Sequence, residues 1–284
     1  GDVYKRQIIK LIKPFKNKIY LNVKNFSQIR YKRLKMKKIN LSKLLVIKVG
    51  SSLTTLPSGL PNLKFIKIIS EQIYRLHKKG FHIVLVSSGA IAQGMKIWKL
   101  DSKPKSIDFL QALSAAGQIG LINSYQKELK RFDLITAQVL LSHSDFKVKK
   151  RSENAKKSIS NLINLGAIPI INENDTTSTD EIKFGDNDIL AAQISKLMKA
   201  NCLILLSNVD GLFESNPSNK SKSKLVSNVK IISRNIKAMA GVASKHGKGG
   251  MISKIKAAEI CLSLIHISEP TRLLSIAYAG VFFK

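Results

Sequence analysis

Five short apolar segments recur along the chain, and helical patterns occupy most of the intervals between them. The segments are rich in Val, Ile and Leu, and each has the length of one buried strand. They lie at residues 44–49, 82–86, 134–141, 167–171 and 202–206. Apolar runs without polar alternation are typical of parallel sheets, because helices cover both faces of such sheets.

Helical periodicity is clearest at residues 62–79, where Phe65, Ile68, Ile69, Ile73 and Leu76 recur at helical spacing. Further helices are predicted at residues 109–130, 152–165, 188–198, 235–239 and 251–260. Strands that alternate with helices predict an α/β fold, an open and mainly parallel sheet with helices on both faces. No apolar run reaches the roughly 20 residues that a membrane-spanning helix needs.

The two ends of the chain differ from this pattern. Asp2–Gln7 and Leu262–Ile267 can be encoded by one oligonucleotide and by its reverse complement, as expected of a sequencing adapter that flanks an insert. We therefore leave these ends out of the fold prediction and expect the native start at Met36. The predicted organisation is a non-native or untranslated leader (1–35), one domain truncated at its C-terminus (36–261), and an adapter-derived tail (262–284).

The composition narrows the class of protein. The formal net charge is +30, but residues 1–40 alone hold 13 Lys and Arg residues against one acid. Aromatic residues make up only 6% of the chain, which favours solvated lysine faces over a nucleic-acid surface. Cys202 and Cys261 form neither a disulfide framework nor a metal-ligand spacing, so we expect a reducing cytoplasm.

Polar or glycine-rich turns follow four of the predicted strands. Their sequences are KVGSS, SSGA, NEND and SNVDG. The carboxyl ends of parallel strands meet at one edge of a sheet, which is where open α/β sheets bind ligands. Exposed backbone N–H groups and helix N-termini at such turns favour anions, so the turns predict a phosphate-bearing ligand.

Acids and amides are concentrated between residues 168 and 190, in the clusters NEND (172–175) and GDND (185–188). So many acids and amides beside a core strand predict a substrate site. Asp175, Asp186 and Asp188 would suit a general base, a metal ligand or an acid that orients lysines. The structural alternative is that Asp186 or Asp188 caps its helix, which leaves the NEND cluster unexplained.

Two lysines occupy positions that call for an explanation. Lys48 lies in an apolar strand, where an ammonium group is costly unless it is paired or reaches a cleft. Lys254 lies one turn into a helix that follows a glycine-rich segment. Each is either a surface lysine or an ammonium directed at a transferred phosphoryl group. The histidines show no partner spacing, and P-loop, protein-kinase and hydrolase motifs are missing.

Six motifs occur in order between residues 44 and 261: KVGSS, SSGAIAQG, INENDT, EIKFGDND, VDGLF and GKGGMISKIKAA. Together they resemble the amino acid kinase family, and INEND followed by EIKFGDND resembles its glutamate-phosphorylating branch. The resemblance implies ATP-dependent phosphorylation of the side-chain carboxylate of L-glutamate to glutamyl 5-phosphate, the first step of proline biosynthesis. It also implies ATP and Mg²⁺ as cofactors and a cytoplasmic homo-oligomer. We expect no membrane partner and, because aromatic residues are sparse, no nucleic-acid partner for this fragment.

The resemblance also implies roles for individual residues. Lys48 and Lys254 would be catalytic lysines, and Asp188 would orient them. The residues that would bind the amino acid are Ser88, Asp175 and Asn187. Those that would bind ATP are Lys48, Ser207, Asn208, Lys248, Gly249, Gly250, Met251, Ile252, Ser253 and Lys254. No side-chain metal ligand is implied.

Two departures and two alternatives accompany this prediction. Asn208 stands where the family often has Asp, and Lys248 stands where it often has Thr, so nucleotide contacts are expected to differ there. A related kinase could instead act on acetylglutamate, aspartate or a nucleoside monophosphate. A basic nucleic-acid-binding protein is the alternative from another class, and it predicts steeply salt-dependent binding.

Overall fold

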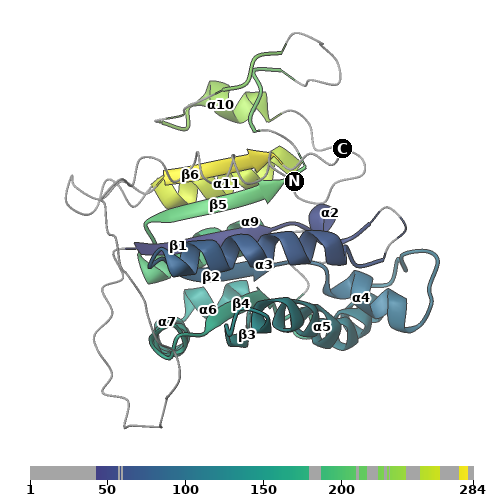
Figure 1. Ribbon diagram of the computed structural model, residues 1–284. Helices are drawn as coiled ribbons and strands as arrows, with labels where there is room; N and C mark the ends of the chain where they lie inside the picture. The colour runs from purple at the N-terminus through teal and green to yellow at the C-terminus, as the bar shows by residue number, and fades with distance from the viewer. Residues whose placement is uncertain are drawn as a thin grey trace.

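A parallel sheet forms the centre of the computed structural model (Figure 1). The structure describes residues 43–56, 58, 60–178, 187–208, 211–215, 223–226, 229, 231–240 and 250–262, and the backbone of 275–280. Within these residues the sheet has six strands in the order β3-β4-β2-β1-β5-β6, and each neighbouring pair is parallel. The strands are β1 (Leu44–Val49), β2 (His82–Ser87), β3 (Thr136–Leu141), β4 (Ile168–Glu173), β5 (Cys202–Ser207) and β6 (Ser275–Gly280).

Helices cover both faces of the sheet, as predicted (Figure 1). They are α2 (Ser51–Thr54), α3 (Leu63–Lys78), α4 (Ala90–Ile97), α5 (Ile107–Lys130), α6 (His143–Lys147), α7 (Lys149–Asn164), α9 (Asn187–Met198), α10 (Arg234–Met239) and α11 (Gly250–Leu262). No helix in the described part of the chain is long and apolar enough to span a bilayer.

Strand β1 shows how the sequence builds two cores. Successive side chains of a strand point to opposite faces, so Leu45 and Ile47 join one core while Leu44 and Val46 join the other. Helices α3 and α5 complete the first core, and α7, α9 and α11 complete the second. Both faces of β1 are therefore buried, which explains why its sequence is apolar without alternation.

The predicted strands and helices are present, but several boundaries differ. Strand β4 extends to Glu173, so Asn172 and Glu173 belong to the strand and not to the loop that follows it. The short helices α2, α4 and α6 were not predicted.

The exclusion of residues 262–284 from the fold was wrong for Ser275–Gly280, because this segment pairs in parallel with β5 as β6. A strand at the edge of a sheet presents unpaired backbone groups, and any adjacent extended segment can satisfy them. The adapter origin of the tail stays a prediction, and Met36 lies outside the described residues.

Glycines allow α4 and α5 to pack with their backbones in contact. A Cβ added at Gly117 would lie 1.9 Å from the carbonyl oxygen of Ala90, and one at Gly94 would lie 2.0 Å from that of Leu113. Real Cβ atoms do not approach backbone atoms so closely, so neither helix tolerates a side chain there. Helix α4 begins at the SSGA turn, so this packing also fixes the position of that turn at the predicted ligand-binding edge.

We expect Gly117→Ala to lower the free energy of unfolding by about 2–3 kcal/mol, because the added methyl group must push α4 and α5 apart. Gly120→Ala is the matched control on the same helix. Its Cβ would lie 3.1 Å from the flexible tip of Gln93, and the better helix propensity of Ala offsets that contact. Urea denaturation of both variants measures the difference, and equal midpoints would contradict the close-packing account.

Candidate active site

The predicted site residues converge at the carboxyl edge of the sheet. Lys48 lies near the end of β1, and Ser88 directly follows β2. Asp175 follows β4 by two residues, Asn187 and Asp188 begin α9, and Lys254 lies in the first turns of α11. The parallel sheet therefore brings together residues that are more than 200 positions apart in the chain.

Asp188 links the two lysines. Its Oδ1 atom lies 2.6 Å from Lys48 Nζ, and its Oδ2 atom lies 3.0 Å from Lys254 Nζ. Ser253 Oγ donates a hydrogen bond of 2.8 Å to the same Oδ2 atom. The side chains of Lys48, Asp188 and Lys254 are 7%, 3% and 11% exposed, so these are buried ion pairs. The alternative interpretation of Lys48 and Lys254 as surface lysines is therefore excluded.

The electrostatics of this cluster favour an anionic ligand. Burial would raise the pKa of Asp188, but the charges of Lys48 and Lys254, with hydrogen bonds from Lys48 and Ser253, lower that pKa to about 2. Burial, together with the charge of Lys48, lowers the pKa of Lys254 although Asp188 opposes the shift. One carboxylate thus faces two ammonium groups, and the excess of positive charge suits phosphate oxygens.

A second group of residues forms a neutral network beside the cluster. Asn187 Nδ2 donates hydrogen bonds to Ser88 Oγ at 2.6 Å and to Asn172 Oδ1 at 2.8 Å. The Nδ2 group of Asn172 donates in turn to Gln118 Oε1 at 2.8 Å. All four residues are buried. The network joins the SSGA turn, β4, α5 and α9 and fixes the predicted substrate residues Ser88 and Asn187 relative to one another.

Asp175 occupies a different environment. Its Oδ2 atom accepts a hydrogen bond of 2.5 Å from Ser114, and its backbone carbonyl accepts one of 2.8 Å from Gln111 Nε2. Burial raises the pKa of Asp175, and the hydrogen bond from Ser114 and the charge of Lys103 oppose that shift. The other carboxylate oxygen, Oδ1, is buried and makes no hydrogen bond among the residues that the structure describes.

Helix α5 supports both Asp175 and the neutral network, and these contacts were not predicted from the sequence. Gln111, Ser114 and Gln118 are spaced i, i+3 and i+7, so they lie on one face of the helix. The one sequence feature that could have indicated this role is the polar stripe itself, which lies beside the small residues 115–117. Its partners are 54 to 64 positions away in the chain, so the sequence could not assign them.

The histidines show no partner spacing in the sequence, and His143 has a structural role. Its Nε2 atom lies 3.3 Å from Glu173 Oε2, and its Nδ1 atom lies 2.7 Å from Gln193 Oε1. Glu173 Oε1 also accepts a hydrogen bond of 2.5 Å from Ser178. Glu173, the last residue of β4, is thereby tied to Ser178 across the loop that carries Asp175.

The predicted nucleotide residues are only partly described. Ser207 is buried at the end of β5 and lies 3.4 Å from the Oδ1 atom of the exposed Asn208. Gly250, Met251 and Ile252 form the first turn of α11. Ser253 is engaged with Asp188. Lys248, Gly249 and Asp186 lie outside the described residues.

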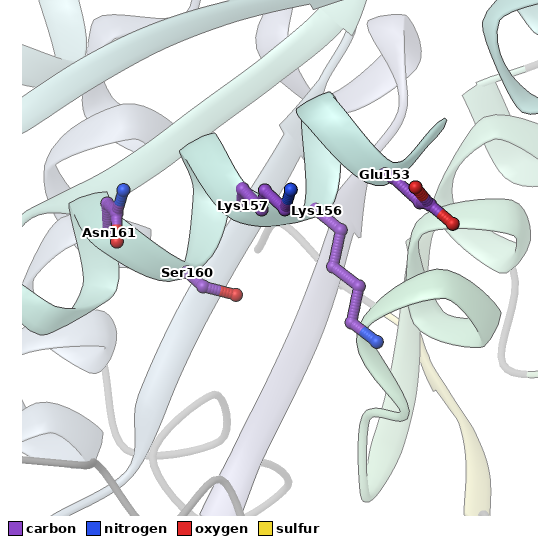
Figure 2. A pocket seen from close by; sticks show the side chains of 5 residues that line it. All are labelled: Glu153, Lys156, Lys157, Ser160 and Asn161. Atoms are coloured by element: carbon purple, nitrogen blue, oxygen red, sulfur yellow. The ribbon is translucent and has the colours of Figure 1, made fainter. Parts of the chain in front are cut away.

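A surface hollow of about 580 Å³ lies elsewhere, along α7 (Figure 2). Its lining residues are Glu153, Lys156, Lys157, Ser160 and Asn161. All five come from one helix, none of them is buried, and none belongs to the converging groups described above. The sheet edge is the stronger candidate, because buried charges and an unsatisfied carboxylate oxygen converge there.

Comparison with known proteins places this geometry in context. A model of the amino acid kinase family matches residues 43–264. The glutamate 5-kinase of Clostridium acetobutylicum is 48% identical over 217 residues, which are 76% of this chain and 81% of that protein. The glutamate 5-kinase of Acinetobacter baumannii is 42% identical over 249 residues, which are 86% of this chain. The chain spans only 66% of the length of the Acinetobacter protein.

A solved structure supports the fold. Carbamate kinase from Giardia lamblia bound to AMP-PNP superposes with a TM-score of 0.53 over 84% of this chain and 93% of that chain. The sequence identity is 15%, so the likeness concerns the arrangement of strands and helices alone.

Asp188→Asn is expected to lower the free energy of unfolding at neutral pH by about 3–5 kcal/mol, because it leaves two buried ammonium groups without a counter-charge. Glu259→Gln is the control, since its ion pair with Lys237 is about half exposed and such pairs contribute about 1 kcal/mol or less. Urea denaturation at pH 7 measures both effects.

The pH dependence gives a second measurement on the same variant. The folded pKa of Asp188 is about 2 against an ordinary value of 3.8, so its stabilisation is present above pH 4 and is lost as the pH falls toward 2. The shift corresponds to about 2 kcal/mol. Asp188→Asn should lose correspondingly less stability over that interval, and an unchanged pH dependence would contradict the ion-pair assignment.

Proposed function

Because the chain belongs to the amino acid kinase family, we propose that it transfers the γ-phosphoryl group of ATP to the side-chain carboxylate of L-glutamate. The products are glutamyl 5-phosphate and ADP, and the reaction is the first step of proline biosynthesis. The observation that carries the proposal is the convergence of Lys48 and Lys254 on Asp188, beside an acid and amide cluster that suits an amino acid.

The two lysines suit phosphoryl transfer. In that reaction a carboxylate oxygen of the acceptor bonds to the γ-phosphorus while the bond from phosphorus to the bridging oxygen of ADP breaks. Negative charge spreads over the transferred group and the leaving oxygen. Ammonium groups that Asp188 already holds in place stabilise this charge without reorganising during the reaction.

The chemistry requires no general base. The side-chain carboxylate of glutamate is already ionised near neutral pH, so no proton has to be removed before it attacks. This matches a cluster of lysines, a carboxylate and a serine around Asp188. His143, the histidine described nearest to the NEND loop, is engaged with Glu173 and Gln193. The protein's task is then to align two anionic reactants and to offset their repulsion.

The substrate half of the site suits a free amino acid. The buried Oδ1 atom of Asp175 is an acceptor that an ammonium group would satisfy. The hydroxyl of Ser88, which accepts a hydrogen bond from Asn187, can donate to a carboxylate. Acetylglutamate carries an amide in place of the ammonium group and cannot neutralise a buried carboxylate. This difference favours glutamate over the acetylated acceptor.

ATP is the nucleotide that a kinase of this family requires, and we propose Mg²⁺ as its companion. Within the described residues, no three His, Cys, Asp or Glu side chains converge to hold a metal ion. Asp188 is already engaged by both lysines. Mg²⁺ commonly binds through substrate phosphates and water with few protein ligands, so it would enter with the nucleotide and neutralise phosphate charge.

Two further properties extend the proposal. Cys202 and Cys261 are free and buried, and burial raises the pKa of both thiols to about 12, which suits a reducing cytoplasm. A homo-oligomeric state is proposed from the family resemblance alone, and light scattering of the purified protein would decide it.

Glutamate-dependent formation of ADP tests the proposed function. The purified protein is expected to release ADP from Mg-ATP with L-glutamate and to do so far more slowly with acetylglutamate, L-aspartate or a nucleoside monophosphate. Hydroxylamine added to the reaction should trap the acyl phosphate as a hydroxamate. Turnover with another acceptor but not with glutamate would overturn the substrate assignment.

Lys48→Ala and Lys254→Ala are each expected to lower kcat by about 10²-fold or more, because each removes a positive charge from the transferred phosphoryl group. Lys256→Ala is the control, since it is an exposed lysine on the same helix as Lys254. Steady-state kinetics at saturating ATP and glutamate measure the effect. Near-normal turnover of either catalytic variant would refute the phosphoryl-lysine assignment.

A further inference from the structure

Ser114 makes an unusual contact for a serine inside a helix. A helical serine commonly donates its hydrogen bond to the carbonyl oxygen four residues earlier, as Ser124 does to Gly120 at 2.8 Å. Ser114 lies on the same helix, α5, and is 2% exposed. It donates instead to Asp175 Oδ2, 61 residues away in the chain. The contact therefore depends on the tertiary structure and joins α5 to the acid that the proposed function assigns to the amino acid.

The two carboxylate oxygens of Asp175 differ in their hydrogen bonding. Oδ2 is occupied by Ser114, whereas Oδ1 is buried without a partner among the described residues. Asp175 as a whole is 5% exposed, so little solvent reaches this acceptor. A buried carboxylate oxygen without a donor is unfavourable, and a ligand that brings a donor removes this penalty.

The same hydrogen bond favours the ionised form of Asp175, although burial raises the pKa of this acid overall. Burial favours the neutral acid, and the hydroxyl of Ser114 is the principal group that opposes it, because a donated hydrogen bond stabilises the charged form. Lys103, from the segment between α4 and α5, acts in the same direction. The carboxylate of Glu173 lies two residues away but is engaged by Ser178 and His143.

We propose that Ser114 is a positioning residue for the amino-acid substrate, because its hydroxyl holds Oδ2 of Asp175 and leaves Oδ1 as the acceptor for the substrate's ammonium group. This inference rests on the proposed function, since it requires a substrate with a free amino group. Ser114 does not touch the reacting atoms. Its effect is on substrate affinity and on the pH at which that affinity is lost, and kcat at saturation is set by the lysine cluster.

The test compares Ser114→Ala with Ser124→Ala, which makes the same chemical change on the same helix away from Asp175. Steady-state kinetics for glutamate and ATP would be measured from pH 5.5 to 9. Ser114→Ala is expected to raise KM for glutamate about tenfold while kcat and KM for ATP stay within about twofold. The acidic limb of kcat/KM for glutamate should move to higher pH, because Asp175 then protonates more readily.

Two further variants separate positioning from packing. Ser114→Cys nearly preserves the side-chain volume but has a weaker donor, so its KM for glutamate should also rise. Ser114→Ala introduced into Asp175→Ala should change glutamate binding no further, because both acceptor oxygens of residue 175 are already absent. Calorimetric titration with glutamate measures binding in variants whose turnover is low.

The outcomes distinguish the two proposals. A wild-type protein that phosphorylates glutamate, with an unchanged KM and acidic limb in Ser114→Ala, would overturn this inference alone. An equal loss of affinity when Ser114→Ala is added to Asp175→Ala would also overturn it, since the effect would not pass through Asp175. A wild-type protein that neither binds nor phosphorylates glutamate would overturn the proposed function and this inference with it.

Discussion

The ion pairs of Asp188 with Lys48 and Lys254 are the interaction on which the site depends. Burying three charged groups is unfavourable unless each is paired, and here one carboxylate pairs with both ammonium groups while Ser253 adds a hydrogen bond. The pairing holds β1, α9 and α11 in register at the edge of the sheet. An excess of positive charge remains, and a ligand with phosphate groups can use it.

The site has two halves of opposite character, and α9 joins them. Asp188 faces the lysine cluster, while the preceding Asn187 faces the network of Ser88 and Asn172. Helix α5 supports the second half through one polar face, and its close packing on α4 depends on glycines. Consecutive residues of one helix thus belong to the lysine cluster proposed for phosphate and to the polar network proposed for the amino acid.

Most of the fold could be predicted from the sequence, because its strands are short apolar runs and its helices are periodic. The predicted lysine and acid residues also converge as expected, since parallel strands place their turns at one edge. Strand β6 could not be predicted in the same way. Its pairing depends on the open edge of β5, a property of the assembled sheet and not of residues 275–280 themselves.

The sequence by itself determined the α/β architecture, the edge at which the site forms, and the residue types that suggest phosphate and amino-acid chemistry. Only the tertiary structure decided how Asp175 is held. Ser114 and Gln111 lie more than 60 positions from their partners, and nothing in a helical serine or glutamine indicates which distant group it will reach. Periodicity assigns a residue to a face of its element, whereas its hydrogen-bond partner depends on how the elements pack.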